Sequence, residues 1–405
     1  MVEAAQPARI VVVGASLAGA SAAVTLRELG YAGELTLIGE EIELPYERPP
    51  LSKAVLLGEA DEPDWVRDES FYADQRIALL RGTTVTRIDR DRHVVVAGGT
   101  DHPYDKLLLA TGSTPRRLDA PGADLDGIFT LRTLPDSLAL RERFTAGADV
   151  VVVGAGWIGC ESAAAARHRG ASVTVVEPLT QPLLRVVGEE VGATFADLHR
   201  EHAVDLRLGT TVVGFGGEGG RVSEVRLPDG VAIPADTVVV GVGVLPNTVL
   251  ADAAGLELAE GGVAVDATLR TSDPDIYAAG DIAAHDHPAY GRRVRVEHWA
   301  NAKDQGEHVA GNLLGAAAAY EKRPFFFSDQ YDLGCEYRGL ADPGRDRLVV
   351  RGNLEQREFI AFWLRNGAVA AALNVNLWDD GDALQDLVDS GRPVEPDALV
   401  SGSLK

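Results

Sequence analysis

The sequence predicts an α/β protein with two doubly wound domains and a small α+β domain at the C-terminus. Residues 10–30 and 150–170 each run from an apolar stretch through a glycine-rich turn into a helix of small residues, and this repetition predicts the two α/β domains. Short β-prone runs separated by turn residues follow Tyr320, and they predict an antiparallel sheet with a terminal helix.

The first repeated unit begins with a buried strand at residues 10–13. This strand ends at Gly14, and Ser16 and Gly19 complete a near match to the fingerprint G-x-G-x-x-G. Small residues at these positions let backbone N–H groups at a helix N-terminus approach a pyrophosphate. Serine at the middle position is small enough to keep that approach. A second strand, 35–38, leads to Glu40, about 20 residues after Gly19, where a ribose hydroxyl needs an acceptor.

The segment between the two units predicts mostly short elements. Pro45, Pro49 and Pro50 fix an extended stretch that ends at a helix beginning near Leu51. Residues 61–75 predict a surface loop with a short helix, residues 85–88 and 93–97 a hairpin, and residues 107–109 a buried strand. That strand ends in Thr111 and Gly112, and residues 115–127 resemble a linker before a short helix at 134–144.

The second unit carries the complete fingerprint. Gly154, Gly156 and Gly159 follow the strand at 150–153, and the next strand ends in Glu177. Two ordinary βα turns are the alternative, but strand, helix and acidic residue recur in both units. We therefore predict two Rossmann-like dinucleotide-binding domains.

The elements after the second unit complete the pattern. We expect a glycine-rich hairpin at 214–220, a strand over 237–243, a turn at Pro246 and Asn247, a strand ending near Asp281, and a helix over 299–315. The strands that end in ATG and AAGD belong to one sheet in this interpretation, with the second unit inserted between them. The expected domains are therefore 1–114 with 245–319, 115–244, and 320–405.

Composition and charge restrict the class of protein. The chain has 405 residues, 46% apolar and 24% charged, and no uncharged apolar stretch is long enough to span a membrane. The N-terminus lacks the features of a signal peptide, so we expect a cytoplasmic protein. A net charge of −23 argues against nucleic acid or an anionic membrane as the main partner. Cys160 and Cys335 are expected to be reduced structural thiols, and no metal site is expected.

Several motifs together carry a resemblance to a known family. The segments GASLAG, YERPPLSK, LLLATGS, GAGWIGCE, VGVLPN, TSDPDIYAAGD, EHWANA and FSDQY closely resemble FAD-dependent, NADH-using ferredoxin reductases of the putidaredoxin-reductase type. Members of this family have the glutathione-reductase fold and pass electrons to [2Fe–2S] ferredoxins of cytochrome P450 or Rieske oxygenase systems. The resemblance spans nearly the whole chain, and RPPLSK and FSDQY are its most specific parts.

The resemblance implies a role for individual residues. It places FAD on Gly14, Ser16, Ala18, Gly19 and Thr111, with Glu40 on the ribose, Val85 near the adenine, Arg48, Lys53 and Arg132 at the pyrophosphate and flavin, Asp281 at the ribitol, and the backbone from Glu297 to Trp299 at the flavin ring. It places NADH on Gly154, Gly156, Ile158, Gly159, Glu177 and Gly243.

The catalytic pair implied by the resemblance is Lys53 with Glu161, as an ion pair beside the reactive nitrogen of the flavin. Alternatively, Glu161 is an acidic residue early in a helix, where the helix dipole favours it. Trp157 and Trp299 occupy positions that vary within the family, and Trp299 is equally well explained as a packed aromatic at a helix start.

Cysteine positions exclude several relatives of the same fold. No cysteine pair follows the first unit, which excludes glutathione, lipoamide and thioredoxin reductases, and no cysteine lies in 45–48, which excludes peroxidases and coenzyme A disulfide reductases. An NADH–rubredoxin reductase and a redox-sensing flavoprotein of the apoptosis-inducing type remain as alternatives, although the latter carries basic surfaces for DNA. The expected partner is a [2Fe–2S] ferredoxin docking on Arg292, Arg293 and Arg295, and the expected oligomeric state is a monomer or a weak homodimer.

Overall fold

The computed structural model describes residues 6–404, which form two compact units. Among these residues, the first unit comprises 6–48, Asp64–Thr114 and Leu245–Pro324. The second comprises Pro49–Pro63, Pro115–Val244 and 325–404. Within residues 6–404, no helix combines the length and the apolar character that a membrane crossing requires.

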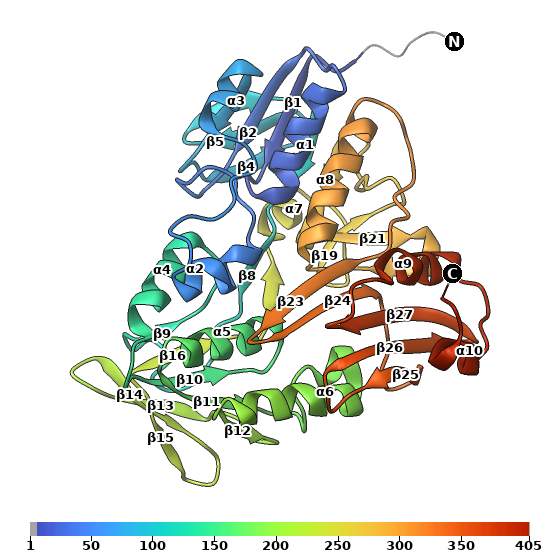
Figure 1. Ribbon diagram of the computed structural model, residues 1–405. Helices are drawn as coiled ribbons and strands as arrows, with labels where there is room; N and C mark the ends of the chain where they lie inside the picture. The colour runs from blue at the N-terminus through green and yellow to red at the C-terminus, as the bar shows by residue number, and fades with distance from the viewer. Residues whose placement is uncertain (1–5, 405) are drawn as a thin grey trace. The chain divides into compact units, whose positions relative to one another are not determined.

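A five-stranded parallel sheet organises the first unit (Figure 1). Its strand order is β20-β7-β1-β2-β3. β20, which comes last in the sequence among these five strands, therefore pairs with β7 at the edge of a sheet that begins near the N-terminus. The apolar residues of β1, Ile10 to Val13, are buried because parallel strands are covered on both faces. The strands are β1 (Arg9–Val13), β2 (Glu34–Ile38), β3 (Ile77–Leu80), β7 (Lys106–Leu109) and β20 (Ile276–Ala278).

Helices α1 (Leu17–Glu28) and α8 (Trp299–Leu313) lie side by side in the first unit (Figure 1). The two helices approach closely at Gly306 of α8, where a Cβ would lie only 2.3 Å from the carbonyl oxygen of Ala18 on α1. Glycine, which has no side chain, allows this approach. The remaining elements of this unit are α3 (Glu69–Asp74), β4 (Val85–Asp89), β5 (Val94–Ala97), β6 (Thr100–Pro103), α7 (Val249–Ala253), β18 (Leu258–Ala259), β19 (Gly262–Val265), η2 (Gly280–Ile282), β21 (Ala283–His287), η3 (Pro288–Tyr290) and β22 (Arg292–Val294).

The second unit repeats the parallel architecture with the order β12-β11-β10-β16-β9. A three-stranded antiparallel sheet, β13-β14-β15, follows α6 and β12 in the chain. The elements are η1 (Pro49–Ser52), α2 (Ala54–Leu57), β9 (Ile128–Phe129), α4 (Leu134–Arg143), β10 (Asp149–Val153), α5 (Trp157–His168), β11 (Ser172–Glu177), α6 (Leu184–Glu201), β12 (Asp205–Leu208), β13 (Gly214–Glu218), β14 (Arg221–Arg226), β15 (Ala232–Pro234) and β16 (Thr237–Val240). Strands β8 (Ser113–Pro115) and β17 (Val244–Pro246) lie where the chain passes between the units.

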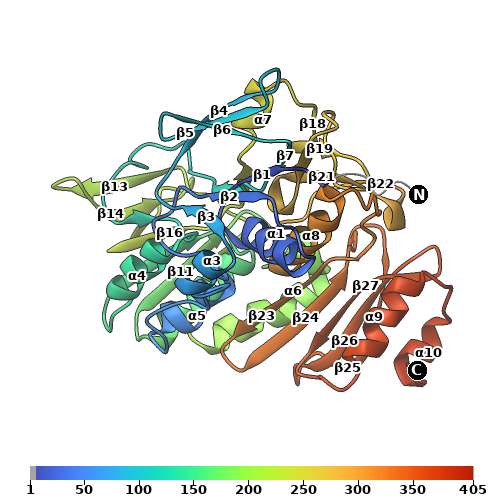
Figure 2. The same ribbon diagram turned by 90° about the horizontal axis from the view of Figure 1, so that it is seen from above.

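The C-terminal part of the second unit is an antiparallel sheet of order β23-β24-β27-β26-β25. Helices α9 (Gly381–Ser390) and α10 (Pro396–Ser401) cover one face of this sheet (Figure 2), and Leu384, Val388 and Leu399 pack there in one apolar cluster with Phe362 and Ala372. The strands are β23 (Phe325–Gln330), β24 (Leu333–Gly339), β25 (Arg347–Asn353), β26 (Glu358–Arg365) and β27 (Ala368–Val375).

The predicted fold class is confirmed, while several boundaries differ from the prediction. The helix expected near Leu51 is a 3₁₀ turn that already begins at Pro49, because proline fits a first helical turn, and the α-helix starts at Ala54. The expected hairpin has a third strand, β6, and the expected terminal helix is a pair. Residues 320–324 belong to the first unit, where the Tyr320 N–H donates to the Ala267 carbonyl at 2.8 Å, and residues 49–63 belong to the second.

Candidate functional site

The first fingerprint turn has a geometry that only glycine permits at two positions. Gly14 has φ of +110°, and a Cβ there would lie 2.1 Å from the carbonyl oxygen of Ala110. A Cβ at Gly19 would lie 1.9 Å from the Gly14 carbonyl oxygen. Ser16 precedes α1 as its N-cap without donating or accepting a side-chain cap hydrogen bond. The start of α1 therefore has no capping side chain in the way of an anion.

The acidic residues after β2 divide into two roles. Glu40 is exposed at the end of the strand, as a residue facing a ribose should be. The next residue, Glu41, accepts hydrogen bonds from Arg48 Nη2 at 2.7 Å and from the Tyr46 hydroxyl at 2.5 Å. Glu41 therefore holds the Arg48 guanidinium in place, a function that the sequence pattern did not reveal. Val85 is buried at the start of β4.

Asp281 lies in the turn after β20 rather than in the strand itself. It is buried and accepts a hydrogen bond from Ser113 Oγ at 2.6 Å. The buried Gln305 side chain accepts from the Gly280 N–H at 2.9 Å and fixes this turn, which the sequence did not predict. Thr111 Oγ1 donates to the Asn247 carbonyl at 2.9 Å, so its hydroxyl ties two chain segments together.

The segment before α8 brings Asp281 together with the partly buried His298. Burial lowers the pKa of His298 to about 4, and the charge of Asp281 opposes this shift. Trp299 starts the helix, and Lys303 Nζ lies 5.7 Å from the centre of its ring. Glu297 is exposed and forms an ion pair with Arg295.

The second fingerprint turn repeats the first within the other unit. Gly154 has φ of +99°, and a Cβ there would lie 2.5 Å from the Gly241 carbonyl oxygen. A Cβ at Gly159 would lie 2.0 Å from the Gly154 carbonyl oxygen, whereas one at Gly156 would meet no atom within 4 Å. Ile158, in the first turn of α5, is exposed. The turn thus combines tight backbone packing with an open helix start.

Glu177 at the end of β11 is tied to this turn by its own carboxylate. One oxygen accepts from the Ala155 N–H at 2.7 Å, and the other accepts from the Leu179 N–H at 3.0 Å. The carboxylate is therefore held at the rim of the glycine turn, with lone pairs left for further donors. Gly243, also in this unit, has φ of +95°, and its carbonyl accepts from the Arg116 N–H at 2.9 Å.

Lys53 and Glu161 form an ion pair inside the second unit, with 2.8 Å between Lys53 Nζ and Glu161 Oε2. Glu161 is only 4% exposed, and it also accepts from Ser52 Oγ at 2.5 Å and from Ser328 Oγ at 2.6 Å. Burying a carboxylate is costly unless it is paired and hydrogen-bonded, and all these donors converge on it. The two serines are site residues that sequence reasoning missed. Arg132 lies in the turn before α4, where its N–H donates to Asp136.

The two tryptophans differ in their surroundings. Trp157 packs edge-on against Phe195 of α6 and Phe326 of β23, with ring centres 5.7 and 4.9 Å away. This aromatic cluster accounts for Trp157 as a packing residue that connects α5 to the C-terminal sheet. Trp299 lies at a helix start with a lysine near its ring.

The arginine cluster expected to dock a partner is not one patch of three free charges. Arg292 is exposed on β22, and Arg293 is partly buried. Arg295 donates to the carbonyl oxygens of Glu260 and Asp281 and pairs with Glu297. Strand geometry contributes to these differences, because successive side chains of β22 point to opposite faces. The docking role of the three arginines stays a prediction.

Comparisons with known proteins agree with this geometry. Residues 8–306 match the family model described as pyridine nucleotide-disulphide oxidoreductase, and residues 325–405 match the model described as reductase C-terminal. The chain is 40% identical to putidaredoxin reductase of Pseudomonas putida over 397 residues, covering 96% of this chain and 94% of that one. It is 42% identical over 395 residues to the ferredoxin reductase subunit of 5,5'-dehydrodivanillate O-demethylase from Sphingobium sp., covering 96% and 95%.

A solved structure extends the comparison to three dimensions. The crystal structure of the covalent putidaredoxin reductase–putidaredoxin complex matches with a TM-score of 0.94 at 38% identity, covering 98% of this chain and 96% of that chain. The similarity thus extends over nearly the whole chain. The chain belongs to the pyridine nucleotide-disulphide oxidoreductase family and carries the reductase C-terminal domain.

Proposed function

We propose that this protein is an FAD-dependent NADH:ferredoxin reductase that serves an oxygenase system. The observation that supports it most is the presence of two glycine-rich turns of the dinucleotide-binding type, together with an ion pair between Lys53 and the buried Glu161 and no cysteine pair. Both cysteines are buried and unlinked, and burial raises the pKa of both thiols, so neither is a nucleophile at neutral pH. Relatives over nearly the full length are ferredoxin reductases by name.

The residues of the first unit fit FAD. Close backbone packing at Gly14 and Gly19 and the uncapped start of α1 suit a pyrophosphate, Glu40 suits a ribose hydroxyl, and Asp281 suits the ribitol chain. Arg48, held by Glu41, supplies a fixed cation. We further assign Ser16, Ala18, Val85, Thr111, Arg132, Glu297 and Trp299 to this cofactor. These residues would hold FAD, which would supply hydride acceptance from NADH and release of electrons one at a time, a combination that nicotinamide does not offer.

The residues of the second unit fit NADH. The turn at Gly154, Gly156 and Gly159 suits its pyrophosphate, and Glu177 suits the adenosine ribose. Ile158 is exposed at the helix start, and we assign it and Gly243 to the same ligand.

Lys53 and Glu161 supply the fixed charges of the reaction. Lys53 Nζ presents a cation whose position is set by Glu161 Oε2 and by the Phe327 ring, 5.2 Å from Nζ to the ring centre. We assign this cation to the reacting end of the flavin, where a positive charge favours the negative charge that reduction brings. Glu161 and its serine donors keep that cation from swinging into solvent.

Replacing Lys53 by Met should lower the flavin reduction potential and slow its reduction by NADH by about tenfold or more. The same change leaves the buried Glu161 carboxylate without its cation, at a stability cost of about 3 kcal/mol. Stopped-flow reduction and a redox titration measure the first effects. Lys53→Arg, which keeps the charge, is the control and should retain most of the potential. A wild-type potential and rate in Lys53→Met would remove Lys53 from the catalytic machinery.

The partner that we propose is a [2Fe–2S] ferredoxin, with Arg292, Arg293 and Arg295 in its docking surface. Replacing Arg292 and Arg293 by Ala should raise the ferredoxin KM by about two- to tenfold and weaken its salt dependence, because rim charges act mainly on encounter. NADH–ferricyanide activity should stay unchanged. Arg345→Gln, which removes an exposed arginine paired with Asp342 at 3.6 Å, is the matched control. An unchanged ferredoxin KM would exclude this surface. We place the protein in the cytoplasm as a monomer or weak homodimer.

A direct experiment tests the proposed function. The purified protein should carry FAD, identified by chromatography of the released cofactor, and should reduce cytochrome c with NADH only when a ferredoxin is added. Carriers with [2Fe–2S] and [3Fe–4S] clusters and a rubredoxin are compared side by side. Turnover with rubredoxin alone, or a folded protein that takes up no flavin, would contradict the proposal.

A further inference from the structure

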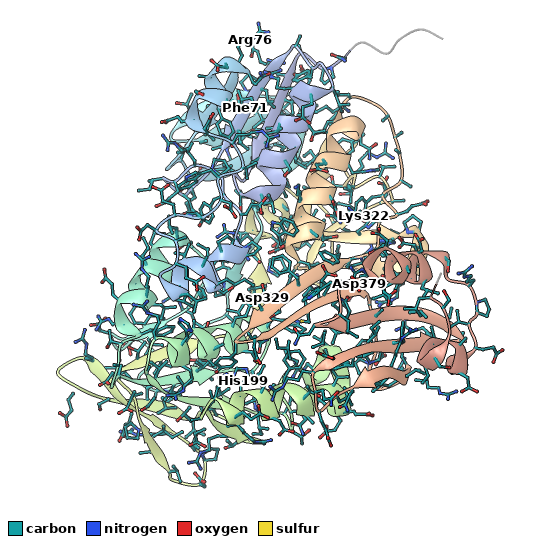
Figure 3. All side chains as sticks on the ribbon, viewed as in Figure 1. Phe71, Arg76, His199, Lys322, Asp329 and Asp379 are labelled. Carbon is teal, nitrogen blue, oxygen red and sulfur yellow. The ribbon has the colours of Figure 1, made fainter. Side chains whose placement is uncertain are left out.

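A chain of buried hydrogen bonds lies behind the Glu161 carboxylate. Ser328 Oγ donates to Glu161 Oε1 at 2.6 Å, and Gln330 Nε2 donates to Ser328 Oγ at 3.2 Å. His199 Nε2 lies 3.0 Å from Gln330 Oε1, and the Tyr331 hydroxyl lies 3.4 Å from His199 Nδ1. His199 projects from α6, while the other residues come from β23 and the turn after it (Figure 3). Four residues outside the Lys53–Glu161 ion pair are therefore connected in series to Glu161.

The hydrogen bonds of this chain all run toward Glu161. Burial lowers the pKa of His199 to about 4, so at neutral pH the imidazole carries one ring N–H. Gln330 Oε1 needs a donor, which assigns that proton to Nε2 and leaves Nδ1 as the acceptor for the Tyr331 hydroxyl. The next two hydrogen bonds run in the same direction. Gln330 Nε2 donates to Ser328 Oγ, and Ser328 Oγ donates to Glu161 Oε1. Aligned hydrogen bonds of this kind strengthen one another in a low dielectric.

Packing alone does not explain polar side chains at these positions. Ser328 and Gln330 alternate along β23, so both face the same side of the strand, and both are completely buried. Burying an amide and a hydroxyl stabilises nothing by itself, and apolar residues of similar size would fill the space without desolvation cost. The polarity is explained if it acts on Glu161.

We propose that Ser328, Gln330 and His199 are positioning residues that fix Glu161 and, through it, hold the Lys53 ammonium in one place. This inference rests on the proposed function, in which that ammonium acts on the flavin. Ser52 and Lys53 hold Glu161 Oε2, and the chain from His199 holds Oε1, so both oxygens are fixed from opposite ends. Without the second anchor the carboxylate can rotate, and Lys53, 17% exposed, gains freedom to move toward solvent.

The experiment measures the placement of Lys53 directly in the purified holoenzyme. Reductive methylation followed by peptide mass spectrometry gives a labelling rate for each of the five lysines, and the exposed Lys322 is the internal reference. In Ser328→Ala and Gln330→Met the rate at Lys53 relative to Lys322 should rise by roughly five- to tenfold, the effect of losing about one charge-assisted hydrogen bond. The flavin potential should fall in the same variants, by less than in Lys53→Met.

The matched control is Ser162→Ala. Ser162 follows Glu161 on α5, is completely buried, and its hydroxyl has no hydrogen-bond partner in the described part of the chain. Its replacement removes the same atom at the same depth and should change neither the labelling rate nor the potential. Ser328→Thr, which keeps the hydroxyl, should restore both. Unchanged labelling of Lys53 in Ser328→Ala and Gln330→Met with wild-type melting temperatures would overturn the proposal, as would an equal change in Ser162→Ala.

The labelling result separates this inference from the proposed function. Lys53 labelling reports the network whether or not the enzyme reduces a ferredoxin. Faster labelling in the variants of a protein that reduces no carrier would support the network and reject the proposed function. Wild-type labelling of Lys53 in variants of a protein that does reduce a ferredoxin would reject the network and support the proposed function.

Discussion

Replacing Gly14 by alanine should abolish retention of FAD. The new Cβ would lie 2.1 Å from the Ala110 carbonyl oxygen, on a residue whose φ of +110° already disfavours any side chain. Either the turn opens or β7 moves away from β1, and both movements destroy the approach to a pyrophosphate. We expect a loss of about 3 kcal/mol or more in stability of the first unit. Flavin absorbance per protein and the melting temperature measure the two effects.

Gly30→Ala is the matched control for this prediction. Gly30 also has a positive φ, +80°, but a Cβ there would meet no atom within 4 Å. It should cost about 1 kcal/mol, from backbone strain alone, and the protein should keep its flavin. Full flavin content in purified Gly14→Ala would show that this turn does not hold the cofactor.

NADH should be preferred over NADPH by roughly 10- to 100-fold in kcat/KM. The 2′-phosphate of NADPH would face the Glu177 carboxylate, and two unit charges about 4 Å apart repel by roughly 4 kcal/mol at an effective dielectric of about 20. Solvent reduces this penalty to about 1.5 to 3 kcal/mol. The structure strengthens the prediction, because hydrogen bonds from the Ala155 and Leu179 N–H groups keep the carboxylate from rotating away. The neighbouring Arg207 is paired with Asp205 at 2.9 Å.

The test compares both nucleotides with ferricyanide as acceptor, so that ferredoxin docking does not contribute. Glu177→Gln keeps an acceptor for a backbone N–H but removes the negative charge. It should therefore reduce the difference in kcat/KM between NADH and NADPH, mainly by raising the value for NADPH. Equal kcat/KM values for the wild-type protein, or a preference for NADPH, would show that Glu177 does not face the ribose.

Local rules predicted the fingerprint turns and the parallel strands. A glycine at φ near +100° or in backbone contact is dictated by its immediate neighbours, and an apolar strand such as 150–153 is recognisable by itself. The Lys53–Glu161 pair came only from the family resemblance. Contacts between residues far apart in the sequence were missed. These are the hydrogen bond from the Gly280 N–H to Gln305, and the hydrogen bonds that connect His199 and Gln330 to Glu161 through Ser328. No short pattern relates residues that meet only after the chain has folded.

The docking role of Arg292, Arg293 and Arg295 stays a prediction, although part of their arrangement could have been expected from the sequence. The three arginines are close in the sequence, yet a strand places neighbouring side chains on opposite faces. That alternation separates Arg292 from Arg293 and Arg295. It does not predict that Arg295 binds the carbonyl oxygens of Glu260 and Asp281, which depends on the turn before β19 and the turn after β20.

The strand order of the first sheet also determines when this protein can acquire its cofactor during synthesis. β20 completes the sheet at the edge of β7, about 170 residues later in the chain, and α8 packs on α1, from which about two thirds of the chain separates it. The parallel sheet of the second unit draws all its strands from residues 128–240. On the ribosome, that sheet has its full complement of strands before β20 has been translated. The N-terminal strands of the first sheet have an unpaired edge during that time, and we expect FAD to bind only after α8 has been translated.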